Sequence, residues 1–125
     1  MIRLLLLLLA FTPFLAAEEK VPQYLYKVIS VENWQASTSL GHVKLTSEDG
    51  EFIHLSTVDQ LDRIIGKYWA SVPEFVVLKL DTSKLLGKLV YEKNPGGENK
   101  YYHLYDGTIP LDSVIESTTR KKVSV

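Results

Sequence analysis

The sequence has no cysteine. Its absence excludes a disulfide framework, a thiol nucleophile and a thiolate metal site. It also excludes the lipid-modified cysteine that anchors bacterial lipoproteins. An exported domain of this size would therefore rely on its hydrophobic core for stability.

An excess of charge of one sign is also lacking. Fourteen Lys and Arg residues stand against 15 Asp and Glu residues, for a formal net charge of −1. There is no broad basic field of the kind that nucleic acid requires. The basic cluster at residues 120–122 is typical of a solvated tail, and we expect no nucleic-acid partner.

A long hydrophobic run is the third absence, because the apolar stretch 4–15 is shorter than the ~20 residues of a spanning helix. Arg3 precedes this stretch and small residues up to Ala17 follow it, which is the layout of a secretory signal peptide. We predict a signal peptide over 1–17 and a single domain over 18–125. The mature protein is expected to be periplasmic or secreted, monomeric and without stable membrane association. An uncleaved membrane anchor is the alternative.

Hydrophobic periodicity predicts an α+β domain. Apolar residues at helical spacing predict one main helix over 57–69, ended by Pro73. A helix of one or two turns is expected after Ser30, and a single turn is expected to end at a C-cap glycine, Gly87. The expected strands are 24–29, 52–55, 75–80, 89–92, 101–105 and one around 114–115, with a short strand at Val43 and Leu45.

Two of these strands carry a histidine at the centre of one face. Side chains alternate along a strand, so the two faces are Phe52, His54, Ser56 and Tyr101, His103, Tyr105. We predict that these faces adjoin and line one cleft, in which His54 and His103 act as acid–base groups or ligand donors. The alternative is that each histidine is half-buried and bonded to a backbone carbonyl. His42 has no such context and is interpreted as a surface loop residue.

Two other chemistries are weakly supported. A metal could be held by His54, His103 and Glu92, but no close histidine spacing favours it, and we predict no metal site. Ser56 lies two residues from His54, yet the Gly-x-Ser-x-Gly elbow of a serine hydrolase is absent.

The order and spacing of several motifs resemble the bacterial domain-of-unknown-function family 952 (DUF952). The resemblance covers about 24–114. It rests on Tyr26-Lys27-Val28-Ile29, Trp34, the run 49–57 with Gln60, the Val77–Leu85 strand, Tyr91-Glu92, and His103-Leu104-Tyr105 with Gly107, Ile109 and Pro110. The chain departs from the family pattern by inserting Glu51 before Phe52 and by carrying Tyr102 where proline is usual.

That family is similar in fold to the ADP-ribosyltransferases, and above all to the RNA 2′-phosphotransferases. The resemblance implies two small packed, mostly antiparallel β-sheets, one main helix, short flanking helices and a cleft. It suggests NAD as a cofactor, with His54 and His103 gripping the dinucleotide and Glu92 steadying charge on the ribose. Ligand-binding positions would be Tyr26, Lys27, Ser56, Tyr101 and Tyr105.

Two functions are therefore expected in order. The first is an exported module that binds a nucleotide-like or other small polar ligand without turnover. The second is an enzyme of the ADP-ribosyl-transfer type. The first is preferred because the chain lacks a full ADP-ribosyltransferase motif set. The chain also retains only Arg63 and Arg120 beyond the predicted signal, too few for the arginine-based grip on RNA phosphate that the RNA 2′-phosphotransferases use.

Overall fold

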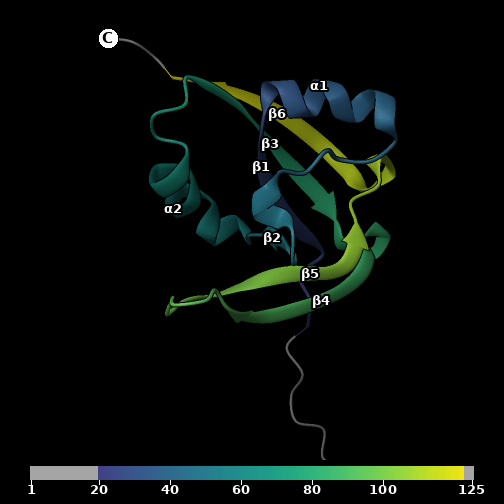
Figure 1. The fold of residues 1–125 in the computed structure, drawn as a ribbon, viewed down its shortest axis with the longest axis vertical. Helices are drawn as coiled ribbons and strands as arrows, with labels where there is room; N and C mark the ends of the chain where they lie inside the picture. Colours follow the sequence, from purple (N-terminus) through teal and green to yellow (C-terminus); the bar gives the residue numbers. More distant parts are fainter. Residues whose placement is uncertain (1–19, 123–125) are drawn as a thin grey trace, which may run out of the picture.

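The computed structural model describes residues 20–122, which form two antiparallel three-stranded sheets and two α-helices (Figure 1). The first sheet has the order β1-β3-β6 and the second β2-β5-β4. The elements are β1 (Tyr24–Ser30), α1 (Val31–Leu40), η1 (Ser47–Asp49), β2 (Ile53–Leu55), α2 (Val58–Tyr68), β3 (Glu74–Asp81), η2 (Thr82–Lys84), β4 (Leu86–Lys93), β5 (Lys100–Thr108), η3 (Leu111–Ser113) and β6 (Val114–Lys121). The α+β prediction is confirmed.

The first sheet is built on the alternation of β1. Leu25, Lys27 and Ile29 are buried on one face, and the residues between them are half-buried on the other. Its neighbour β3 is almost continuously apolar and lies between β1 and β6. Such a strand suits the centre of a sheet that is covered on both faces.

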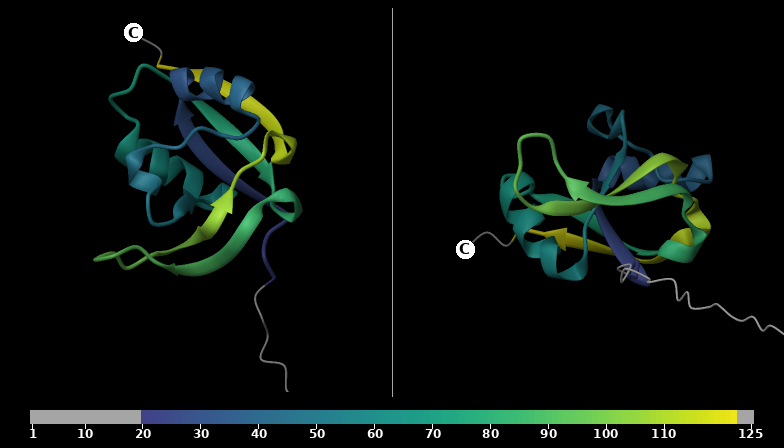
Figure 2. Two further views of the ribbon diagram at one scale, coloured as in Figure 1. Left: turned by 45° about the vertical axis from the view of Figure 1, so that its right-hand side comes forward. Right: turned by 90° about the horizontal axis from the view of Figure 1, so that it is seen from below.

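The second sheet is dominated by the curved hairpin of β4 and β5, which runs beneath the first sheet (Figures 1 and 2). Gly87 lies where the register shifts, with φ of 123°, and a Cβ there would come 2.6 Å from the carbonyl oxygen of Tyr105. Only glycine accepts both this backbone conformation and this close approach. The hairpin therefore bends sharply at Gly87, which is a strand residue rather than the helix cap that the sequence suggested.

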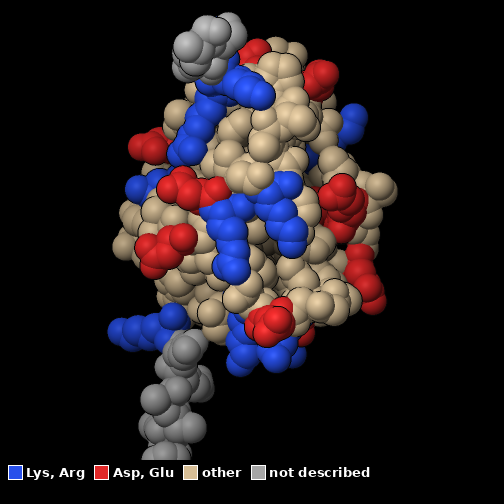
Figure 3. Space-filling model, turned by 90° about the vertical axis from the view of Figure 1, so that its left-hand side faces the viewer, with Lys and Arg blue, Asp and Glu red and all other residues tan. Residues whose placement is uncertain are grey.

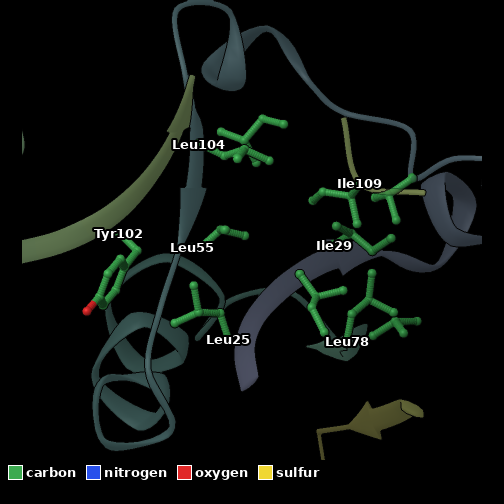
Figure 4. Close-up of a cluster of buried hydrophobic side chains, with 11 residues drawn as sticks. Leu25, Ile29, Leu55, Leu78, Tyr102, Leu104 and Ile109 are labelled. Atoms are coloured by element: carbon green, nitrogen blue, oxygen red, sulfur yellow. The ribbon is translucent and has the colours of Figure 1, made fainter. Parts of the chain in front are cut away.

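The two sheets meet at β1. Tyr26 and Ser56 form an isolated antiparallel bridge, with N–H···O distances of 2.8 and 2.9 Å. The largest buried cluster fills the space between the sheets (Figure 4), and its labelled members are Leu25, Ile29, Leu55, Leu78, Tyr102, Leu104 and Ile109. The end of β2 and the edge of β1 are thereby held together.

Helix α2 covers the opposite face of the first sheet. Leu61 packs with Phe75 and Val77 in a second buried cluster. Thr57 is the N-cap, and its backbone N–H donates to the Gln60 side chain at 3.0 Å. The predicted helix over 57–69 is therefore confirmed, with Thr57 and Trp69 as its capping residues.

Helix α1 is longer than the sequence suggested. It has 10 residues, not one or two turns, although its N-cap Ser30 was anticipated and accepts from the Asn33 backbone N–H at 3.0 Å. Ser37 Oγ donates to the Asn33 carbonyl within the helix, so this hydroxyl satisfies a helix carbonyl and does not end the helix. Gly41, with φ of 83°, ends it.

Other boundaries also changed. Val43 is buried and bonds its N–H to the Ile109 carbonyl at 2.8 Å, but the predicted strand at Val43 and Leu45 is absent from the described chain. The last strand, β6, extends through Lys121, well beyond the two residues expected.

Within residues 20–122 no helix is long and apolar enough to cross a membrane. The predicted signal peptide at 1–17 lies outside the described residues.

Candidate functional site

A pocket of about 480 Å³ lies where β1, β2, the η1 turn and the second half of α2 come together. Its polar part includes Lys27, Asp49, His54 and Ser56. Its aromatic part includes Tyr26, Tyr68, Trp69 and Tyr101. A pocket lined by aromatic rings together with a few polar groups is typical of small-molecule sites.

His54 is oriented by a carboxylate in this pocket. Its ring Nδ1 lies 3.0 Å from Asp49 Oδ1, and its backbone N–H donates to the same oxygen at 3.0 Å. An ionised carboxylate only accepts hydrogen bonds, so Nδ1 carries the proton. The neutral ring then has its lone pair on Nε2. The His54 side chain is 42% exposed, whereas that of Asp49 is 6% exposed.

Lys27 neutralises the charge of Asp49. Its ammonium lies 3.1 Å from each Asp49 carboxylate oxygen and 3.0 Å from the His54 carbonyl oxygen. These three acceptors match the three donors of a lysine. Lys27 is buried, so the Lys27–Asp49 ion pair next to His54 is almost shielded from solvent.

The protonation states of Asp49 and Lys27 follow from their contacts. Burial alone would raise the pKa of Asp49, but the hydrogen bonds from His54 and the charge of Lys27 outweigh it and lower the pKa to about 2. Burial lowers the pKa of Lys27, and Asp49 opposes that shift. Asp49 is therefore ionised throughout the neutral range.

His103 lies directly opposite His54, since the two are paired in the β2–β5 register. Its side chain has no exposure to solvent. Nδ1 lies 2.7 Å from Glu92 Oε2, Nε2 lies 2.7 Å from Asn94 Oδ1, and the Phe52 ring stacks on the imidazole at 3.9 Å. Both ring nitrogens are thus engaged within the protein.

Glu92 joins His103 to Tyr105. The Tyr105 hydroxyl donates a short hydrogen bond to Glu92 Oε2, the oxygen that also contacts His103. Hydrogen bonds from Tyr105 and then His103 lower the pKa of Glu92. The same bond raises the pKa of Tyr105 to about 12, because losing the phenolic proton would place two negative charges together.

The structure separates the predicted site residues into two groups. His54, Tyr26, Lys27, Ser56 and Tyr101 line the pocket. His103, Glu92 and Tyr105 do not line it, although the centroids of the two imidazole rings are only 5.4 Å apart. The adjoining strands were anticipated, but His103 is buried behind His54.

Sequence analysis gave no site role to three residues that line the pocket: Asp49, Asn94 and Trp69. Trp69 also packs against the second buried cluster. Asp49 lies five residues before His54, a spacing that has no strand or helix meaning until the η1 turn folds back. The only feature of the sequence that could have pointed to Asp49 was its place at the start of the run 49–57 that contains His54.

Among the described residues, no group of three or more His, Asp or Glu side chains is placed to hold a metal ion. His42 is exposed and bonds Nδ1 to the Val43 carbonyl at 3.2 Å, away from the pocket.

Comparison with known proteins identifies the family. A search of curated proteins finds no match. The crystal structure of protein CC0527 from Caulobacter crescentus is similar, with a TM-score of 0.67 and 26% identity over 77% of this chain and 84% of that one. The solution NMR structure of CC0527 is similar with a TM-score of 0.66 and 25% identity, over 78% of this chain and 84% of that one. The family model described as a protein of unknown function matches residues 28–117, more than half of the chain. The chain belongs to the DUF952 family.

Proposed function

We propose that this protein binds a nucleotide-like or other small polar ligand in the pocket beside His54. The observation that carries the proposal is the orientation of His54. Its Nδ1 is held by Asp49, so Nε2 is left to the 42% exposed part of the side chain in a pocket of about 480 Å³. Among residues 20–122, no group is paired with that nitrogen.

The surroundings of His54 support a role in binding. Maintaining a buried lysine and aspartate costs desolvation energy, and a hydrophobic pair would fill the same space more simply. The Lys27–Asp49 pair instead positions an imidazole at a pocket that aromatic rings also line. Rings such as those of Trp69 and Tyr26 suit the flat face of a base or sugar.

Fluorescence can test the proposal. The chain has two tryptophans, and Trp69 lines the pocket whereas Trp34 does not. In a Trp34→Phe background, emission from Trp69 reports directly on the pocket. We expect at least one of NAD, ADP-ribose, adenosine and small sugars to change this emission saturably.

A matched pair of histidine variants provides the control. His54→Ala should abolish or strongly weaken the response, whereas His42→Ala should leave it unchanged. Absence of any saturable response to the four probes, confirmed by ligand-detected NMR, would contradict the proposal.

The second candidate is ADP-ribosyl transfer from NAD, for which the chain would resemble the ADP-ribosyltransferases in fold as well as chemistry. The pairing of two histidines on adjoining strands, with His54 at the pocket, favours it. However, the Glu92 carboxylate contacts His103 and Tyr105 and does not line the pocket. Release of nicotinamide from NAD, lost in Glu92→Gln, would support this candidate over simple binding.

Export is the remaining part of the proposal. The basic start, apolar run and small residues of 1–17 favour a cleaved signal peptide. Mass spectrometry of the protein from its native compartment should find an N-terminus near Glu18. An intact Met1 in a membrane fraction would contradict it.

A further inference from the structure

We propose that the pocket selects an uncharged ligand with an amide-like edge, which pairs with the main-chain N–H and C=O of Val28. This inference rests on the proposed function and names the class of ligand. The ligand would present one donor and one adjacent acceptor to the edge of β1, and a further donor to His54.

The register of β1 places the main chain of Val28 on a free edge. In an antiparallel strand, alternate residues direct both backbone polar groups to the same side. The N–H and C=O of Tyr26 bond to Ser56, away from β3. Those of Val28, two residues later, face the same way.

Nothing in the described chain takes these two groups. The antiparallel register that pairs Tyr26 with Ser56 would bring Val28 opposite His54 in β2, but the bridge is confined to Tyr26 and Ser56, and β2 forms no backbone bond to Val28. No backbone bond to Val28 is formed from the 44–46 segment, which also borders the pocket. Val28 itself lines the pocket. A donor and acceptor side by side, open to a cavity, match an amide group or the hydrogen-bonding edge of a nucleobase.

The charges of the pocket favour an uncharged ligand. The ammonium of Lys27 is already surrounded by the two Asp49 oxygens and the His54 carbonyl. Lys44, the other lysine of the pocket, is exposed, so solvent screens its charge. On the α2 side of the molecule, acidic and basic side chains are interspersed (Figure 3). No unpaired buried cation is present in the described pocket to hold a phosphate.

His54 extends this selectivity. With its Nδ1 proton directed to Asp49, the neutral ring accepts through Nε2. It therefore suits a ligand hydroxyl or N–H rather than the oxygen of a phosphate or carboxylate.

Two nucleosides and one nucleotide test the proposal with Trp69 emission in the Trp34→Phe protein. Adenosine carries an amino donor beside a ring acceptor. N6,N6-dimethyladenosine lacks that donor, and adenosine monophosphate adds charge. At pH 8 we expect the dimethylated compound to bind at least about tenfold more weakly than adenosine, because the Val28 carbonyl loses its partner. Adenosine monophosphate should bind no more tightly than adenosine.

Amide hydrogen exchange tests the same idea without mutation. In the free protein the Val28 amide should exchange faster than the Tyr26 amide, which bonds to Ser56 at 2.8 Å. Saturating adenosine should slow exchange at Val28.

Proline at position 28 removes the donor without breaking the ladder to β3, since the lost N–H faces the pocket. Val28→Pro should weaken adenosine binding at least about tenfold relative to Val28→Ala, which loses the same side-chain packing but keeps the N–H. If Val28→Pro does not fold, the exchange measurement still decides.

The outcomes separate this inference from the proposed function. If no probe binds, both fail. If adenosine binds while the dimethylated compound binds equally well, or Val28 exchange is unaltered, only the amide-edge inference is overturned. If adenosine monophosphate binds tenfold more tightly and Lys44→Gln removes that gain, the pocket selects a charged ligand and the inference is likewise overturned.

Discussion

His54 and His103 are direct partners across β2 and β5, yet their surroundings are opposite. His54 is 42% exposed, uses one ring nitrogen on Asp49 and borders a pocket. His103 has no exposure and uses both nitrogens, on Glu92 and Asn94. The comparison teaches that the same strand context can leave one histidine open to a pocket and enclose its neighbour completely.

The Phe52 ring explains part of the difference. It stacks on His103 at 3.9 Å, while its centroid is 4.9 Å from that of His54 at a tilt of 53°. Phe52 thus covers one imidazole and leaves the other open. Around His103 the β4–β5 hairpin supplies hydrogen-bond partners, whereas around His54 the η1 turn supplies one.

The largest expected effect is the loss of stability when the buried Lys27–Asp49 ion pair is broken. Lys27→Met removes one member of a buried pair and leaves Asp49 without its cation. We expect the free energy of unfolding to fall by about 3–5 kcal/mol, measured by urea denaturation. Lys44→Met, at an exposed position, is the control and should change stability little.

A double variant sharpens this prediction. Lys27→Met combined with Asp49→Asn should recover part of the loss, because the unpaired charge is then removed. If the double variant lost more free energy of unfolding than the two single variants lose together, the pairing would be contradicted.

Replacing His103 should lower the free energy of unfolding more than replacing His54. His103→Ala creates a cavity under Phe52 and leaves Glu92 and Asn94 without their shared partner, so we expect a loss of about 2–4 kcal/mol. His54→Ala should cost less than about 1 kcal/mol, since its side chain is partly in solvent. Equal losses from the two substitutions would remove the distinction drawn between them.

Acid should remove the stability that the ionised Asp49 contributes beside His54. The pKa of Asp49 is about 2 in the folded protein and near 3.8 when unperturbed, so the unfolded state binds its proton first as the pH falls. This group contributes about 2 kcal/mol above pH 4 that is lost as the pH falls from about 4 through 2. Urea unfolding of wild type and Asp49→Asn between pH 5 and pH 2 measures it, and the variant should show a shallower decline.

The smallest effect lies on the His103 side and is spectroscopic. Glu92→Gln removes the carboxylate that holds the pKa of Tyr105 at about 12. The pKa of Tyr105 should then move down toward 10, as seen by ultraviolet absorbance at alkaline pH. Tyr105→Phe identifies the affected tyrosine, and a late-titrating phenol that persists in Tyr105→Phe would assign the shift to another residue.

Much of the fold was predictable because it depends on local pattern. The α2 helix followed from apolar spacing and the Thr57 cap, and β3 from its continuous apolar run. The length of α1 was not, because Ser37 and Thr38 look like helix-ending residues. Their hydroxyls instead bond to the carbonyls of Asn33 and Gln35 inside the helix. The strand role of Gly87 depends on the close approach of Tyr105 across the hairpin.

The candidate site divides in the same way. Alternation along β2 and β5 was sufficient to place His54 and His103 on adjoining strands. The sequence by itself therefore determined the main helix, most of the strands, their faces and the histidine pair, since these follow from backbone periodicity. Only the tertiary structure decided which histidine stays open, because Asp49, Lys27, Glu92 and Asn94 reach the rings from separate elements. Burial and hydrogen-bond partners set the chemistry of an imidazole, and neither is encoded in the spacing of the motif.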